Sequence, residues 1–351
     1  MKTFEFNNFI YYDGLTEEGN LIKVGHKKKR PKNVYKFYSL SENSVKCLTE
    51  SYFYAPHSYE LNDILDGSTF FLNASKPIPF KYYESFLKNL MEPEKFLEFY
   101  EEDIKRNSRG YIGLFWQMLS NRLGIVSVTS VEDNLLMWPH YTNERGFQLK
   151  FNTNALEKSI IEKLPGHYFG FHPINYTKEL VQLDLSKINS TYISLLYCAT
   201  VKSVKWKYEN EWRFILSNEN MGVPNSKSGL NPSKDLMGKP NKRSIYYDKS
   251  LIEEITFGAN FIIGKDFHIE RVKNSDIMKV KLINKRKREQ KIILNLLNFC
   301  LENLSDKIYF SGHTLQQNKN KQICIKRTKE RMIVTKIDEI TFQFERTHEW
   351  K

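Results

Sequence analysis

Residues 205–216 combine more side chains that could do chemistry than any other stretch of the chain. They read Lys-Trp-Lys-Tyr-Glu-Asn-Glu-Trp-Arg-Phe-Ile-Leu. Successive side chains of a β-strand point to opposite faces, so a strand here would place the carboxylates of Glu209 and Glu211 beside the guanidinium of Arg213. Such a row can acquire shifted pKa values and form the floor of a polar cleft. The alternative is an exposed strand face on which Arg213 only neutralises its neighbours. The opposite face would carry aromatic and aliphatic residues, namely Trp206, Tyr208, Trp212, Phe214 and Leu216.

The length and composition indicate a folded protein with an uneven positive charge. A chain of 351 residues makes one large domain or two ordinary ones, and 14% aromatic residues argue against disorder. The formal net charge is +12, of which residues 265–351 contribute +9. We therefore expect a polyanionic partner to meet the C-terminal part first.

The cysteines and the N-terminus limit the possible classes of protein. Four cysteines lie far apart without metal-ligand spacing, so we expect buried, reduced thiols and no metal. The first residues lack the pattern of a signal peptide, and no apolar run reaches 18 residues. These observations predict a cytoplasmic protein that does not enter a membrane.

The hydrophobic periodicity divides the chain into three parts. Residues 1–33 form a hairpin-like lead with Asp13-Gly14 as its turn, and residues 34–264 form the core. Within the core, residues 79–120 carry apolar side chains at helical spacing, which predicts a helical insertion. Strands are expected near residues 34–39, 124–130, 145–151 and 252–258. Residues 265–351 form a basic C-terminal extension.

Two polar segments outside residues 205–216 are also candidates for ligand contact. Asn62 and Asp63 lie in a loop between hydrophobic stretches, where they could fix a turn or touch a ligand. His140 and Tyr141 follow Pro139, which limits the preceding helix. A histidine at such a break can be structural or functional.

The C-terminal extension contains two basic runs. Residues 285–291 begin with Lys285, Arg286, Lys287 and Arg288 and lead into an apolar helix, where cations are disfavoured by the helix dipole unless an anion lies nearby. A second run, which includes Lys326 and Arg327, separates two strand-like segments and predicts a surface hairpin. Either run could track phosphates, and ordinary surface solubility is the competing explanation.

Several separate motifs resemble a bacterial family catalogued as domain of unknown function 2971 and its abortive-infection relatives of the AbiGi type. The resemblance covers residues 34–260, and the family has no settled activity. Its motifs are Tyr35-Lys-Phe-Tyr-Ser39, Asn62-Asp63, residues 124–130, Leu136-Met-Trp-Pro-His-Tyr141, Gly146-Phe-Gln-Leu-Lys-Phe151, Asn210-Glu-Trp-Arg213 and Ile255-Thr-Phe-Gly258.

The order of elements is also similar to that of the ADP-ribosyltransferase superfamily, including DarT-type enzymes that modify DNA. Lys36 stands where that superfamily has Arg or His, residues 127–130 stand for its Ser-Thr-Ser strand, and Glu209-Asn-Glu211 for its Glu-x-Glu motif. Lys36 is a departure, because lysine lacks the bidentate fork of arginine. The resemblance implies an α+β fold with a mixed or antiparallel sheet, split as in those enzymes, with a helical insertion and a basic C-terminal α/β extension.

The same resemblance implies NAD as substrate. Glu211 would stabilise the oxocarbenium-like state and Glu209 would orient or deprotonate the acceptor. No Gly-rich phosphate loop is present, which disfavours a dehydrogenase or an NTPase. The expected NAD-binding residues are Lys36, Tyr38, Ser39, Asn62, Ser127, Trp138, His140, Tyr141 and Arg213.

The leading hypothesis is therefore an NAD-dependent ADP-ribosyltransferase that modifies RNA or DNA as a toxin or phage-defence effector, with an antitoxin or chaperone as a further partner. A second hypothesis is a non-catalytic nucleic-acid-binding or sensor module. A third is a metal-dependent nuclease, in which Glu209, Glu211 and Asp63 would share a cation.

Overall fold

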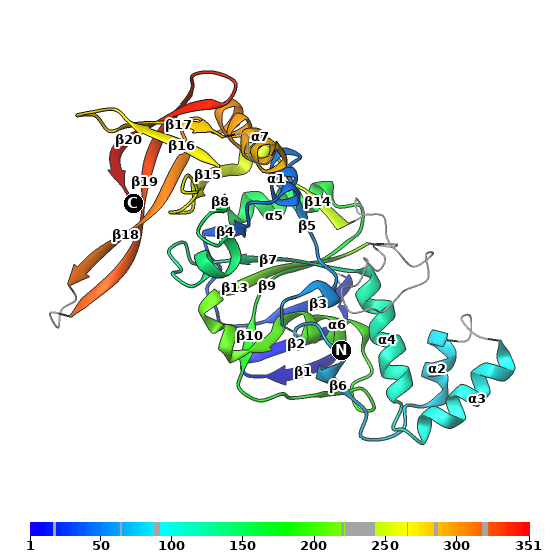
Figure 1. Ribbon diagram of the computed structural model, residues 1–351. Coiled ribbons are helices and arrows are strands. Elements are labelled where there is room, and N and C mark those ends of the chain that lie inside the picture. The colour runs from blue at the N-terminus through cyan, green and yellow to red at the C-terminus, as the bar shows by residue number, and fades with distance from the viewer. Residues whose placement is uncertain are drawn as a thin grey trace.

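A large mixed β-sheet extends from the C-terminal strands to the middle of the molecule (Figure 1). The computed structural model describes residues 1–16, 19–63, 65–87, 92–218, 221, 243–264, 266–283, 287–317 and 322–351. Within these residues the sheet has eleven strands, and its pairs are antiparallel except for one. The predicted α+β class with a mixed sheet is confirmed. In spatial order the strands are β16 (Phe267–Arg271), β17 (Ile277–Leu282), β20 (Thr341–Trp350), β19 (Ile323–Lys336), β18 (Ile308–Gln317), β15 (Ile252–Phe257), β8 (Phe147–Asn152), β4 (Asn33–Tyr38), β7 (Leu123–Thr129), β13 (Glu211–Ser217) and β9 (His167–Pro173).

The N-terminal lead is a separate three-stranded antiparallel sheet of β1 (Lys2–Phe6), β2 (Phe9–Thr16) and β3 (Gly19–Gly25). The predicted turn at Asp13-Gly14 is wrong, because both residues lie inside β2 and pair with β3. The first turn falls at Asn7 and Asn8, which have φ angles of 49° and 65°. Asparagine tolerates this left-handed region, and consecutive left-handed residues suit a two-residue hairpin.

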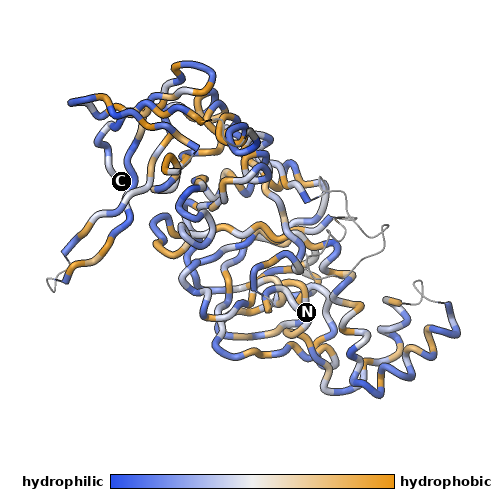
Figure 2. Tube along the Cα trace, viewed as in Figure 1, coloured by the Kyte–Doolittle hydropathy of each residue, from blue (hydrophilic) through white to orange (hydrophobic). Residues whose placement is uncertain are grey.

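The predicted helical segment at residues 79–120 contains α2 (Phe80–Leu87), α3 (Pro93–Ile104) and α4 (Arg109–Arg122). These helices form a lobe at the opposite end of the molecule from the C-terminal strands (Figure 1). Along them, hydrophobic and hydrophilic segments alternate (Figure 2), as amphipathic helices require. The buried Asp103 carboxylate fixes the α3–α4 corner by accepting hydrogen bonds from the backbone N–H groups of Gly110 and Tyr111 at 2.7 and 2.8 Å. No helix in the described part of the chain is long and apolar enough to cross a bilayer.

Hydrophobic clusters cover both faces of the central sheet. One face packs against α1 (Glu42–Thr49), α5 (Thr153–Lys163) and α7 (Lys287–Asn303). The other packs against α4, α6 (Thr191–Thr200) and the N-terminal sheet. Trp212, Phe214 and Leu216 face the first cluster and Ile215 the second, so the predicted faces are correct for this part of the strand.

The prediction of one continuous strand over residues 205–216 is wrong. Val204–Glu209 form the 3₁₀ helix η4, and β13 begins only at Glu211. The hydroxyl of Ser203 accepts a hydrogen bond from the Lys205 N–H, and Asn210 adopts a left-handed φ of 44°. These local capping groups override the two-residue alternation. Trp206 and Tyr208 are consequently half-buried near the surface instead of lying in the core.

The C-terminal residues continue the same sheet. β15 and β18 pair in parallel, and α7 lies in the connection between them. β19 is one strand of 14 residues, so the predicted hairpin around residues 326–331 is wrong. The hairpin is instead formed by β18 and β19, whose far end projects from the body of the molecule (Figure 1).

The sheet opens between β4 and β7. β4 pairs with β8 from Asn33 to Tyr38, but the register with β7 contains the single pair Tyr35↔Thr129. β7 in turn pairs along its whole length with β13. The side chains that follow Tyr35 on β4 and precede Thr129 on β7 therefore border a gap inside the sheet.

Candidate functional site

A cleft lies at this opening and encloses about 740 Å³ of space, its open mouth included. Its walls are largely apolar, while its floor is charged. The apolar and aromatic lining residues are Tyr35, Phe37, Pro56, Leu61, Val128, Met137 and Tyr141. The charged residues are Lys36, Glu60, Asp66, Lys202, Glu209, Glu211 and Arg213. Apolar walls around convergent polar groups are typical of a small-molecule site, and this cleft has as many charged as apolar lining residues.

Arg213 anchors the floor of the cleft. Its side chain is fully buried, and its Nε donates to Glu211 Oε1 at 2.8 Å. Both terminal nitrogens donate to the carboxylate of Asp66, and Nη1 also donates to the Ala199 carbonyl oxygen at 2.8 Å. Four of the five N–H groups of the guanidinium are therefore used within the protein. Arg213, predicted to bind NAD, instead orients two carboxylates.

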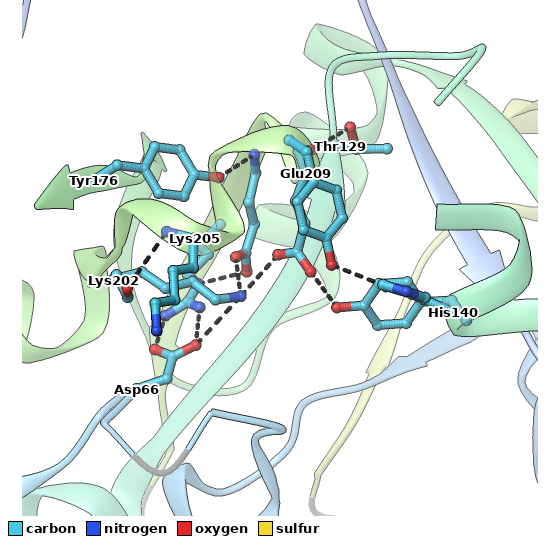
Figure 3. Close-up of polar contacts among 12 residues, drawn as sticks. Asp66, Thr129, His140, Tyr176, Lys202, Lys205 and Glu209 are labelled. Atoms are coloured by element: carbon cyan, nitrogen blue, oxygen red, sulfur yellow. Dashed lines mark hydrogen bonds and ion pairs between the residues drawn. The ribbon is translucent and has the colours of Figure 1, made fainter. Parts of the chain in front are cut away.

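Lys202 joins the carboxylates to one another. It comes from β12 (Val201–Ser203), and its Nζ lies 2.8 Å from Glu209 Oε2 and 2.9 Å from Glu211 Oε2 (Figure 3). The same nitrogen is 3.7 Å from Asp66 Oδ2. One buried ammonium therefore stands between all three acidic side chains.

Glu209 reaches the site through the turn at the end of η4. Its backbone carbonyl accepts a hydrogen bond from Thr129 Oγ1 at 2.6 Å, which fixes the turn against β7. Its carboxylate accepts from Lys202 and from the hydroxyl of Tyr141. The structure thus brings Glu209 beside Glu211, as the sequence predicted, although by a turn instead of by strand alternation.

The two glutamates have pKa values shifted in opposite directions. Burial raises the pKa of Glu209 above its ordinary value, although Lys202 opposes the shift. Burial acts in the same sense on Glu211, but there Arg213 and Lys202 outweigh it and hold the pKa well below the usual range. Glu211 is therefore ionised at neutral pH, whereas Glu209 is better suited to exchange a proton. Neighbouring carboxylates with divergent pKa values are a recurring sign of divided acid–base roles.

Lys36 lies at the mouth of the charged cluster and faces the cleft. Its Nζ donates to the Ser127 carbonyl oxygen at 2.7 Å across the gap between β4 and β7. Among the described residues no carboxylate pairs with it. Burial lowers its pKa, with Glu211 opposing the change. An ammonium with free N–H groups at this place can bind an anion.

The cleft continues into a larger groove of about 1730 Å³, open mouth included. Lys36, Phe37, Pro56, Glu60 and Tyr141 line both cavities. Four tyrosines give the groove its aromatic character, and they are Tyr38, Tyr52, Tyr54 and Tyr246. Together the cavities form an elongated site with a charged end and an aromatic end.

The structure places the remaining predicted NAD-binding residues in three locations. Asn62 and Ser127 line the cleft. Tyr38 and Ser39 line the aromatic groove. Trp138 and His140 line neither cavity.

The contact of Trp138 and His140 with a ligand stays a prediction, and in the structure both side chains have partners outside the two cavities. Trp138 is buried between Phe37 and Arg327, whose guanidinium lies 4.5 Å from the indole ring. His140 Nδ1 lies 3.1 Å from the hydroxyl of Tyr208, outside the cleft. Both belong to a short π-helical turn, η3 (Trp138–Thr142), of which only Tyr141 lines the cleft.

The predicted nucleic-acid contacts of the C-terminal runs are only partly described. Lys285 and Arg286 lie outside the described residues, and Lys287 begins α7. Arg288 is exposed and pairs with Glu42 at 2.8 Å, and Lys326 is exposed. Arg327, in contrast, is buried and makes a two-point contact with Glu144.

Sequence reasoning missed three residues of the site. Lys202 and Asp66 complete the ionic cluster, and the hydroxyl of Tyr176 accepts a hydrogen bond from the Glu211 N–H at 3.0 Å. Asp66 lies close to Asn62 and Asp63 in the same polar loop, so the polarity of that loop could have indicated Asp66 as a site residue. Lys202 and Tyr176 belong to short strands that no pattern distinguishes.

Comparison with protein families gives a match in the middle of the chain. The model of a protein family of unknown function, DUF2971, matches residues 137–214. That segment includes Tyr141 and four of the seven charged residues of the cleft, namely Lys202, Glu209, Glu211 and Arg213. No curated protein and no solved structure matches the chain.

Proposed function

We propose that this protein is an NAD-dependent ADP-ribosyltransferase that modifies a nucleic acid, and that it acts as a toxin or defence effector. The observation that carries the proposal is the Glu209–Glu211 pair: two buried carboxylates share Lys202 and have pKa values shifted in opposite directions. They lie at the floor of a cleft where β4 and β7 diverge. Such an opening is what an ADP-ribosyltransferase-like split sheet would require.

The reaction assigns a different task to each glutamate. The bond between ribose C1′ and the nicotinamide nitrogen breaks, and its electron pair leaves with neutral nicotinamide. The ionised Glu211 stabilises the positive charge that develops on the ribose. Each of its oxygens accepts one bond from Arg213 or Lys202 and keeps a second lone pair for the sugar. A lone pair of the acceptor then forms the new bond to C1′, and Glu209 takes the acceptor proton.

The elongated site fits a dinucleotide. Its charged end would hold the nicotinamide ribose, and Lys36, at the junction with the groove, would meet the pyrophosphate as a point charge. The tyrosines of the groove would pack against the adenine ring. The match to DUF2971 is compatible with this proposal but gives no chemistry of its own.

One observation favours a second candidate, a binding module without catalysis. Asp66, Glu209 and Glu211 are all paired with Lys202 or Arg213, and a satisfied buried network can be purely structural. A nuclease has less support, because ammonium and guanidinium groups hold the carboxylates that a metal would need. Asp63, proposed for that role, caps the Leu65 N–H at 3.1 Å instead. Within the described residues no cluster of His, Cys, Asp or Glu is arranged to hold a metal.

The test uses NAD labelled either in nicotinamide or in the adenylate phosphate, incubated with total RNA or DNA, with and without magnesium. We expect magnesium-independent release of nicotinamide and transfer of the phosphate label to nucleic acid. Glu211→Gln should lower nicotinamide release at least 100-fold, because it removes the charge and keeps the shape. Glu253→Gln, an exposed glutamate on β15, is the matched control and should leave release unchanged.

Glu209→Gln separates the two roles. It should retain hydrolysis of NAD by water and lose transfer to nucleic acid by about 10²–10⁴-fold, the usual size of a general-base contribution. Full NAD turnover by a folded Glu211→Gln variant would contradict the proposal. Strand cleavage that needs magnesium, without use of NAD, would support a nuclease instead.

A further inference from the structure

The surface beside the cleft carries cations and aromatic rings from two segments that are distant in sequence. The loop between β3 and β4 contributes Lys27, Lys28 and Lys29, and η4 contributes Lys205 and Lys207. All five are exposed, although the ammonium of Lys28 is partly buried, and among the described residues none of them pairs with a carboxylate. Lys32, also exposed and without a carboxylate partner in that part of the structure, extends the loop side. Together these six lysines form a basic track.

Direct contacts join the loop between β3 and β4 to the charged end of the cleft. The Nζ of Lys28 lies 5.2 Å from the ring centre of Tyr176, whose hydroxyl accepts from the Glu211 N–H. It also donates to the Ile174 carbonyl oxygen at 2.6 Å. Burial and the charge of Lys207 lower the pKa of Lys28, so the two segments lie near enough to repel.

A second route connects the same two segments. Lys29, Arg30 and Lys32 line a shallow hollow that also includes Ser130. The Ser130 hydroxyl donates to the backbone carbonyl of Asn210 at 3.2 Å. Asn210 separates Glu209 from Glu211, so the hollow ends at the turn that carries these two glutamates.

The segment η4 alternates cations with rings. Trp206 and Tyr208 are half-buried, and their ring centres lie 6.2 Å apart with planes inclined at 34°. Lys202 lies 4.9 Å from the Trp206 ring and contacts both glutamates, which links the rings to the cleft. His140 holds the hydroxyl of Tyr208. Rings of this kind beside free lysines suit unpaired bases and their phosphates.

We propose that the basic track and the Trp206–Tyr208 pair bind a single-stranded nucleic acid and lead it into the cleft. The inference rests on the proposed function in that the bound strand would be the acceptor. A single strand fits better than a duplex, because stacking on Trp206 needs an unpaired base and a base inside a duplex cannot reach a buried carboxylate. The acceptor would thus bind at the N-terminal side of the site, not at the C-terminal basic runs.

Binding is measured by fluorescence anisotropy with a fluorescein-labelled, mixed-sequence strand of about 12 nucleotides, within the usual site sizes, at several salt concentrations and without NAD. Replacing Lys27, Lys29, Lys32, Lys205 and Lys207 by Gln should lower the log–log salt slope by up to about 3.5, at roughly 0.7 per lost contact with a single strand. The control replaces Lys76, Lys95 and Lys249, exposed lysines elsewhere, and should leave the slope nearly unchanged.

Trp206→Ala tests stacking separately from charge. It should weaken binding of the strand about 5- to 100-fold and leave the salt slope unchanged, because no cation is lost. The duplex form of the same sequence should bind more weakly and be insensitive to this change. Equal binding of heparin and strand, with no effect of Trp206→Ala, would reduce the track to a general polyanion surface and overturn the proposal.

Parallel assays distinguish failure of the track from failure of the proposed function. Hydrolysis of NAD by water, measured without nucleic acid, should be unchanged in the five-lysine variant. If the wild-type protein hydrolyses NAD but does not bind the strand, the track is refuted and the enzyme assignment stands. If it binds the strand through the track but does not consume NAD, the enzyme assignment is refuted and the track stands. A further variant carries Gln in place of Lys285, Arg286, Lys287 and Arg288. If the log–log salt slope of strand binding falls in this variant but not in the five-lysine variant, the track is also refuted.

Discussion

Replacing Lys202 by methionine should unbalance the charge of the buried cluster. Lys202 neutralises part of the charge of Asp66, Glu209 and Glu211. Without it Arg213 would still pair with Asp66 and Glu211, and Glu209 would keep only the hydrogen bond from the Tyr141 hydroxyl. Removing one partner of a buried ion pair typically costs about 3–5 kcal/mol of unfolding free energy, because the other charges lose their compensation. With an unfolding entropy of roughly 2.1 cal/mol/K per residue, this is a fall in Tm of roughly 4–7 °C.

The loss of unfolding free energy in the Lys202→Met variant should depend on pH. The pKa of Glu209 is already raised in the folded wild type, and without Lys202 it should rise further. A carboxyl with a raised folded pKa contributes stability below its unfolded pKa and loses that contribution as pH rises through the folded value. The deficit of the Lys202→Met variant should therefore be larger at pH 8 than at pH 5. Glu211 has the opposite effect, because its folded pKa is lowered. Its contribution to stability is present at both pH 5 and pH 8 and is lost only in strongly acidic solution.

Urea unfolding and thermal scans at pH 5 and pH 8 measure both effects. Lys205→Met is the matched control, since it removes an exposed lysine three residues away and should leave the Tm unchanged. Adding Glu209→Gln to Lys202→Met should restore about 0.5–3 kcal/mol by coupling between the two sites. A folded Lys202→Met protein with wild-type stability at both pH values would refute the charge-balance reasoning.

Three further changes test other parts of the structure. Trp212→Ala should lower the unfolding free energy by about 3–5 kcal/mol in urea titrations, because the buried ring stacks on Phe171 at 4.9 Å; an unchanged midpoint would mean that its face is misassigned. Arg327→Gln should lower the unfolding free energy by about 3 kcal/mol, because it leaves Glu144 without its partner. The affinity for single-stranded nucleic acid should stay the same. Lys36→Met should raise the KM for NAD with little effect on Tm, and restoration of the wild-type KM by Lys36→Arg would support its role as a phosphate contact.

The sequence predicted the parts of the fold that depend on periodicity. The helices at residues 80–122 and the faces of residues 211–216 follow from repeats of apolar side chains, which burial enforces. It failed at residues 204–210, where Ser203 and Asn210 make local hydrogen bonds that alternation does not register. It also failed at residues 322–334, because the basic residues of β19 include Arg327 and Lys329, which are buried by pairing with Glu144, Glu132 and Glu254.

The candidate site was predictable only where its residues are neighbours in the chain. Glu209, Glu211 and Arg213 formed a visible group, but Asp66 and Lys202 enter through separate segments, and a long-range ion pair leaves no local pattern. Arg213 illustrates the consequence. An arginine beside two glutamates suggests a ligand contact, whereas in the structure Asp66, distant in sequence, accepts two of its N–H groups.

The opening between β4 and β7 and the ionic cluster depend on each other. Strands that part inside a sheet leave backbone polar groups without ladder partners, which is costly unless other groups satisfy them. Lys36 satisfies one of these groups by donating to the Ser127 carbonyl oxygen, and Thr129 secures the far end of the gap through the Glu209 carbonyl. The side chains that keep the sheet open are thus the neighbours of the carboxylates that use the opening. A cleft of this kind needs charged residues for its own structure, and under the proposed function the same charges would also act on the substrate.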